Sequence, residues 1–184
     1  MKKYICSFIV TAISGSILGI ITEFSLIYNM KWLISITQNE LFWVVIAIFV
    51  AIFSKDYWST EINTTTTLGL MTISYYIVRL IKSGYTNVEG ICWYGLEAIC
   101  VSLYVGNIVY LIKEKIRGKK ISNNIPKLSF IFMTLFLIIG IVVDTYRLYN
   151  SIFNIQPVYL ICILSIIGYI LGTILGILRN KRIK

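Results

Sequence analysis

The chain has 184 residues, of which 58% are hydrophobic and 14% are charged, and its mean hydropathy is +0.82. Soluble domains are about half apolar and a quarter charged, so this composition excludes an ordinary soluble globule. The net charge of +9 comes from short basic clusters between apolar runs, which is typical of a membrane protein and argues against nucleic-acid binding, since that function usually needs a continuous basic face.

Six apolar segments are predicted to be membrane-spanning helices, because a span needs about 20 mostly apolar residues. They are residues 4–28, 40–53, 62–81, 90–112, 128–148 and 158–178, of which the second is short. Residues 29–39 are predicted to be an amphipathic connection in the membrane interface. Pro126 and Pro157 precede the last two spans, where proline suits the first turn of a helix. We expect an all-α polytopic helix bundle that forms a single transmembrane domain over residues 1–184.

The distribution of basic residues predicts the orientation of the chain. With the N-terminus in the cytoplasm, only four of the 17 Lys and Arg residues fall on the outer side. These four are Lys31, Arg79, Lys82 and Arg147, and the others lie in cytoplasmic segments. Because cytoplasmic loops are enriched in Lys and Arg, we predict that both termini are cytoplasmic. The first segment, which follows Lys2 and Lys3, is interpreted as an uncleaved first helix rather than a secretory signal.

Ionisable side chains within the spans are costly in a bilayer and therefore indicate a function or a structural pairing. Spacings of three and four residues place polar side chains on one face of each of three successive spans. We predict an outward-facing binding pocket, whose candidate ligand-binding residues are Glu97, Arg79, Trp93, Tyr76, Asp144 and Arg147. The alternative is structural: the two arginines extend to the outer interface, Asp144 pairs with Arg147, and Glu97 bonds to a neighbour.

Small residues form two ridges of the GxxxG type, which allow helix backbones to approach closely in a membrane. Gly15 and Gly19 lie on the first predicted helix, and Gly168, Gly172 and Gly176 lie on the last. These ridges are expected to pack helices within the chain, with the first helix against the last as one arrangement. Alternatively, they dock another membrane subunit.

No catalytic residue, metal site or cofactor is predicted. The chain has no histidine, which weighs against metalloproteases, hydrolases with a Ser-His or Cys-His pair and histidine-dependent lipid phosphatases. It has no glycine-rich phosphate loop, and its four cysteines show no CxxC spacing. An enzyme is therefore not indicated, although a lipid-modifying enzyme that uses Glu97 or Asp144 as a base stays an alternative.

Several features are similar to those of known membrane proteins. The abundance of Ile, Lys and Asn, the short basic ends, the turn Lys55-Asp56-Tyr57-Trp58 and the pair Tyr75-Tyr76 resemble small six-span proteins of low-GC Gram-positive bacteria. In size and span count the chain is also similar to the substrate-binding subunits of energy-coupling-factor transporters. That resemblance implies a vitamin site near the outer face and docking on a transmembrane coupling subunit, here through Gly15 and Gly19.

These observations favour a non-enzymatic subunit of a bacterial plasma membrane that binds a small ligand or a partner protein from the outer side. Its expected partners are the lipid bilayer and, through the glycine ridges, another membrane subunit; nucleic acid is not expected. The alternative from another class is a self-contained structural or protective membrane protein of the bacteriocin-immunity type.

Overall fold

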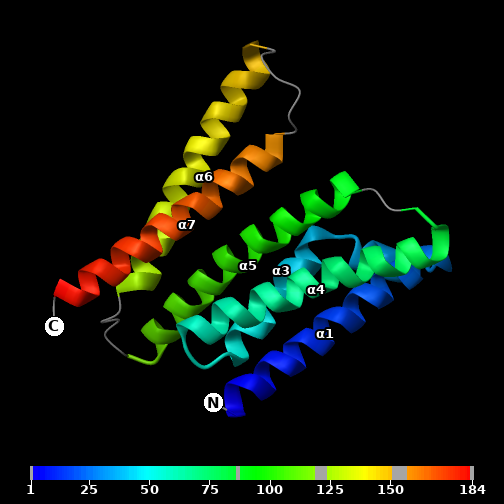
Figure 1. The fold of residues 1–184 in the computed structure, drawn as a ribbon, viewed down its shortest axis with the longest axis horizontal. Helices are drawn as coiled ribbons and strands as arrows, with labels where there is room; N and C mark the ends of the chain where they lie inside the picture. The colour runs from blue at the N-terminus through cyan, green and yellow to red at the C-terminus, as the bar shows by residue number, and fades with distance from the viewer. Residues whose placement is uncertain (1, 86–87, 119–123, 151–156, 183–184) are drawn as a thin grey trace. The chain divides into compact units, whose positions relative to one another are not determined.

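The structure, a computed structural model, describes residues 2–85, 88–118, 124–150 and 157–182. Within these ranges the side chains of residues 2–6, 144, 146–150, 157–158 and 182 are not described. The described residues form seven helices and no strand (Figure 1), which confirms the predicted all-α fold. The helices are α1 (Lys2–Ile27), α2 (Lys31–Thr37), α3 (Glu40–Phe53), α4 (Tyr57–Ser83), α5 (Val88–Ile116), α6 (Asn124–Asn150) and α7 (Pro157–Arg182).

Each predicted span coincides with one long helix, and the predicted interfacial connection contains the short helix α2. In the described part of the chain, four helical segments are long and apolar enough to cross a membrane: Ser7–Ile27, Val88–Ile116, Asn124–Val143 and Tyr159–Lys181. Together, α2 and α3 are apolar enough as well, but they meet at an angle of 62°. The remaining long helix, α4, is the most polar of the long helices.

The chain forms two compact units, Met1–Val109 and Tyr110–Lys184. In the first unit α1 lies along α4, and α3 packs against α4 as well. The apolar core of this unit consists of Ala47 from α3, Leu68 and Met71 from α4, and Ala98 from α5. In the second unit α6 and α7 form an antiparallel pair (Figure 1). The predicted single domain over residues 1–184 is not tested by this division.

Helix α4 is the central helix of the first unit, and burial explains its polar composition. Its threonines satisfy their hydroxyl groups on the helix itself: Thr64, Thr67 and Thr72 each donate to the carbonyl four residues earlier, at 2.8, 2.8 and 3.0 Å. All three side chains are buried. A threonine that bonds back to its own helix leaves only its methyl group to be packed. The polar face of α4 therefore meets other helices rather than the surroundings.

Local signals fix both ends of α4. Asp56 accepts a hydrogen bond from the Ser59 amide at 3.0 Å, and the Ser59 hydroxyl accepts one from the Asp56 amide at 3.1 Å, which forms a capping box. The predicted turn at Lys55 to Trp58 is thus the start of this helix. At the other end Gly84 has a φ of 68°, the left-handed conformation that glycine adopts without strain.

The glycine ridge of α1 packs against α4. A methyl group added at Gly15 would lie 2.3 Å from the Thr67 carbonyl oxygen, and one added at Gly19 would lie 2.1 Å from that of Met71. These distances are well below van der Waals contact, so the two backbones touch at both glycines. Within the described structure the helix that this ridge contacts is α4.

The glycine ridge of α7 packs in the same way against α6. Methyl groups added at Gly168, Gly172 and Gly176 would lie 2.4–2.5 Å from backbone atoms of Phe132, Leu128 and Ile125. Close approach also allows hydroxyl groups to meet across the pair, and Ser129 and Thr173 are hydrogen-bonded at 2.9 Å. The two ridges therefore organise the two units separately, one in each.

Candidate functional site

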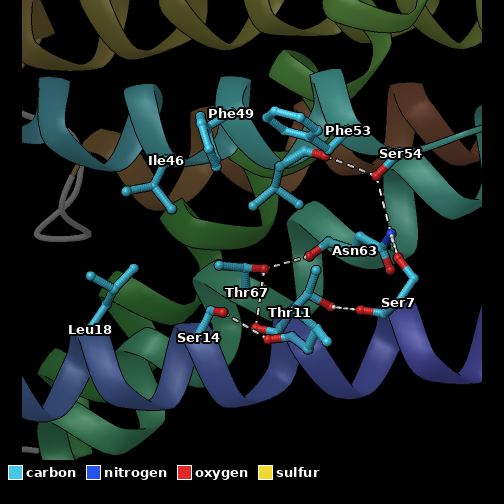
Figure 2. Close-up of a pocket in the computed structure, with 12 residues that line it drawn as sticks. Ser7, Thr11, Ser14, Leu18, Ile46, Phe49, Phe53, Ser54, Asn63 and Thr67 are labelled. Atoms are coloured by element: carbon cyan, nitrogen blue, oxygen red, sulfur yellow. Dashed lines mark hydrogen bonds between the residues drawn. The ribbon is translucent and has the colours of Figure 1, made fainter.

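A cleft of about 510 Å³ lies in the first unit between α1, α3 and α4 (Figure 2). Its lining is amphipathic, with apolar residues from α1 and α3 and with hydroxyl or amide groups from α1, from α4 and from Ser54, which follows α3. The lining residues are Ser7, Val10, Thr11, Ser14, Leu18, Ile46, Phe49, Val50, Phe53, Ser54, Asn63 and Thr67. Ligand pockets in proteins have volumes of about 300–1,000 Å³, so the cleft has room for a small organic molecule.

One end of the cleft is polar. The Asn63 side-chain amide donates to the Ser7 hydroxyl at 2.9 Å and to the Ser54 hydroxyl at 3.1 Å, so this residue connects α4 to α1 and to the end of α3 (Figure 2). Both amide hydrogens are used by these bonds. The Asn63 side-chain oxygen accepts no hydrogen bond from the described residues. It is consequently an acceptor that a molecule in the cleft can use.

The other end of the cleft is apolar. Leu18 from α1 and Ile46 from α3 point into the space between the two helices (Figure 2), and Phe49 from α3 lines the cleft beside them. Between the two ends, Thr67 donates to the Asn63 carbonyl at 2.8 Å, so its methyl group and not its hydroxyl hydrogen is free for contact. The side chains of Phe53 and Val10 are 72% and 56% exposed, so the cleft is open to the outside of the helices and is not an enclosed cavity.

A second polar cluster surrounds Arg79 on α4. The Arg79 guanidinium donates to the Tyr75 hydroxyl at 3.2 Å and lies 5.9 Å from the centre of the Tyr75 ring. Glu23 of α1 is 5% exposed and lies within interaction range of both side chains. The Tyr76 ring packs edge-on against Tyr75 and faces Tyr94 of α5, with centroid distances of 4.9 and 6.3 Å.

This second cluster encloses only a small cavity of about 30 Å³. It is lined by Thr22, Gln38, Trp43, Thr72, Tyr75, Tyr76 and Tyr94. Because the centre of one water molecule needs about 10–15 Å³ of free volume, the cavity has room for one or two waters. The cluster is therefore suited to stabilising the packing of α1 against α4 rather than to binding a ligand.

The predicted ligand-binding residues are only partly brought together. Arg79 and Tyr76 belong to the cluster around Tyr75. Glu97 is half-buried elsewhere on α5, within electrostatic range of Glu40. Trp93 is also half-buried, and neither residue lines one of the two cavities. The side chains of Asp144 and Arg147 lie outside the described part of the structure.

The sequence prediction missed the residues of the larger cleft. Ser7 is far along the chain from Ser54 and Asn63, and none of the three is charged, so the criterion of costly ionisable groups does not select them. The only local signal is a run of small hydroxyl residues on α1, with Ser7, Thr11 and Ser14 spaced at three and four. This spacing places them on one helix face, next to the glycine ridge.

Comparison of the chain with protein-family models, with curated proteins and with solved structures finds no match.

Proposed function

We propose that this chain is a non-enzymatic integral membrane protein that binds an amphipathic, lipid-like molecule in the cleft between α1, α3 and α4. The observation that carries this proposal is the combination of the cleft's volume of about 510 Å³ with its polar and apolar ends. A lipid-like molecule has the matching shape: a polar head that forms hydrogen bonds and a linear apolar chain.

We propose six spans with both termini in the cytoplasm. The four long apolar helices support four of the spans, and the bent pair of α2 and α3 supports another. The sixth is α4, which has 27 residues and is thus about 40 Å long, enough to cross a bilayer. Its low hydropathy is compatible with a span because its polar side chains are buried among other helices, where the bilayer does not meet them.

In this topology the cleft lies in the cytoplasmic half of the membrane. Helix α1 starts at the cytoplasmic side, which puts Ser7 near the inner surface and Leu18 near the middle of the bilayer. Helix α3 runs in the opposite direction, so Ser54 is again near the inner surface and Ile46 near the middle. The polar end of the cleft thus lies at headgroup depth and its apolar end at acyl-chain depth.

The polar end favours a head group with both a donor and an acceptor. The free acceptor is the Asn63 side-chain oxygen, and the Ser7 hydroxyl, which accepts from Asn63 at 2.9 Å, retains its hydrogen as a donor. Exposed Lys55 follows Ser54 directly and adds a positive charge on the cytoplasmic side. An anionic or zwitterionic lipid of the inner leaflet fits this combination. The site proposed here is therefore on the inner side, whereas the polar residues within the spans predict an outer one.

Replacement of Ser14 by tryptophan is expected to block the cleft. Ser14 lies on its exposed edge and its hydroxyl bonds back to the Val10 carbonyl at 2.8 Å, so the large ring costs no hydrogen bond between helices. Native mass spectrometry of protein purified from membranes should find a bound lipid-mass adduct on the wild type. The Ser14→Trp variant should retain roughly tenfold less of it.

The matched control is Ile13→Trp, one residue away and 55% exposed, but not part of the cleft. It should carry the same amount of adduct as the wild type. The proposal is wrong if no adduct is found on the wild type, or if both variants lose it equally.

A further inference from the structure

Glu61 is an unusual residue of the first unit, because its carboxyl group is buried and has no partner among the residues that the structure describes. It lies one turn into α4 and is 3% exposed. Neither of its carboxyl oxygens accepts a hydrogen bond or forms an ion pair in the described structure. Buried polar groups are nearly always hydrogen-bonded and buried charges are nearly always paired, so two bare oxygens on one carboxyl group indicate a missing ligand.

Residues of α4 and α5 surround the carboxyl group of Glu61. Gly106 of α5 faces it, and a methyl group added at this glycine would lie 3.0 Å from the carboxyl oxygen Oε1 and 3.3 Å from the Thr64 hydroxyl oxygen. The glycine thus leaves space for both groups. Next to them, Thr65 and Ser102 join α4 and α5 by a hydrogen bond of 3.0 Å between their hydroxyl groups.

Two oxygen atoms near Glu61 are hydrogen-bond acceptors, the Thr64 hydroxyl oxygen and the Ser102 carbonyl oxygen. The Thr64 hydroxyl donates to the Thr60 carbonyl at 2.8 Å, which turns its lone pairs towards the neighbouring space. The Ser102 carbonyl oxygen is 3.4 Å from the same hydroxyl oxygen. Oxygen atoms of carboxyl, hydroxyl and carbonyl groups are what hard cations prefer as ligands.

Among the residues that the structure describes, no positive charge pairs with Glu61. The charged residues nearest to this contact in the sequence of the two helices are Asp56, before α4 begins, and Lys113, near the end of α5, and neither pairs with it. Within the two helices, the tyrosines nearest in sequence to Glu61 and Gly106 are Tyr57 on α4 and Tyr104 on α5. A tyrosine carries no positive charge in any protonation state. The described part of the chain therefore supplies no charge that balances the carboxylate.

We propose that Glu61, with Thr64 beside it, is a binding site for a small monovalent cation, either a proton or Na⁺, between α4 and α5. The cation neutralises the carboxyl group and satisfies the oxygens that the protein leaves bare. The inference does not depend on the lipid-like ligand, because Glu61 does not line the cleft.

The test is the dependence of thermal stability on cations in the full-length protein in detergent. A cation that binds only the folded state stabilises it by mass action. The melting temperature of the wild type should rise by roughly 5–10 °C when the cation goes from well below to about 100-fold above its dissociation constant. Two titrations distinguish Na⁺ from a proton as the bound cation. In one, NaCl replaces choline chloride at fixed pH; in the other, the pH is varied without Na⁺.

The decisive variant is Glu61→Gln, which has nearly the same shape but no charge to neutralise. Its melting temperature should be insensitive to the cation that stabilises the wild type, whereas the control Glu97→Gln should keep the wild-type dependence. A response to Na⁺ identifies a sodium site, and stabilisation at low pH without a response to Na⁺ identifies a proton site. The proposal is overturned if the wild type responds to neither cation, or if Glu61→Gln responds as the wild type does.

A second measurement covers the case that Glu61→Gln does not fold. Dicyclohexylcarbodiimide reacts with protonated carboxyl groups in apolar surroundings, and the modified residue can be mapped by peptide mass spectrometry. In the wild type, modification of Glu61 should decrease when Na⁺ is added at fixed pH or when the pH is raised. Modification that is unaffected by either change would overturn the proposal.

Discussion

Replacement of Gly19 by alanine is expected to lower the stability of the isolated chain by about 1–3 kcal/mol, the usual cost of overpacking. The added methyl group would lie 2.1 Å from the Met71 carbonyl oxygen and 3.0 Å from the Tyr75 amide nitrogen, both backbone atoms of α4. Backbone cannot rotate away as a side chain does, so α1 and α4 must separate. Separation of the two helices weakens the packing at Gly15. It also lengthens the contacts of Glu23 with the polar cluster around Arg79.

Thermal unfolding in detergent, followed by size-exclusion chromatography, measures this loss. The matched control is Gly69→Ala on α4, where an added methyl group meets no atom within 4 Å. Because alanine is a better helix former than glycine by about 1 kcal/mol, the control should be neutral or stabilised. A Gly19→Ala chain as stable as the wild type would contradict the α1–α4 packing. It would favour the alternative in which this ridge is free to dock another subunit.

Replacement of Gly172 by alanine is expected to have an effect of similar size on the second unit. The methyl group would lie 2.4 Å from the Leu128 carbonyl oxygen and 2.6 Å from the Ser129 α-carbon. Separation of α6 and α7 would also break the hydrogen bond between Ser129 and Thr173, which is 2.9 Å long. Hydroxyl bonds between membrane helices contribute about 0.6 kcal/mol on average, so most of the loss comes from packing.

A graded comparison makes this second prediction specific. At Gly140 of α6 an added methyl group would lie 3.0 Å from the Ile161 α-carbon, a contact that small shifts relieve. Gly140→Ala should therefore lower the melting temperature less than Gly172→Ala. Gly95→Ala on α5, with no atom within 4 Å, should leave it unchanged or raised. The reverse order of these three variants would be incompatible with the α6–α7 interface.

The helices were predictable from the sequence because each long helix carries its own local signal. Apolar composition gives their approximate length, and the two prolines lie near the starts of the last two helices. The close packing of the glycine ridges was predictable too, since GxxxG has a direct steric meaning. The helices that they contact were not predictable, because pairing depends on surfaces far apart in the chain.

Neither the cleft nor the Glu61 site could be predicted from the sequence, and the reasons differ. The cleft is made of neutral residues from three helices, and no residue type marks its lining. Glu61 carries a clear chemical signal, but it precedes the predicted start of the third span at residue 62 and so was not counted as intramembrane. In the structure α4 begins at Tyr57, and the extra turn brings Glu61 against Gly106 of α5.

The six-span topology, which decides on which side of the membrane the cleft lies, is tested most directly by labelling of single cysteines. Tyr85 and Lys115 flank α5 and are exposed, so each is replaced by cysteine in a chain whose own four cysteines are changed to alanine. A membrane-impermeant maleimide added to intact cells should label Tyr85→Cys, whereas Lys115→Cys should react only after the membrane is opened. Labelling of both positions from outside, or of Lys115→Cys alone, would contradict the topology and with it the cytoplasmic placement of the cleft.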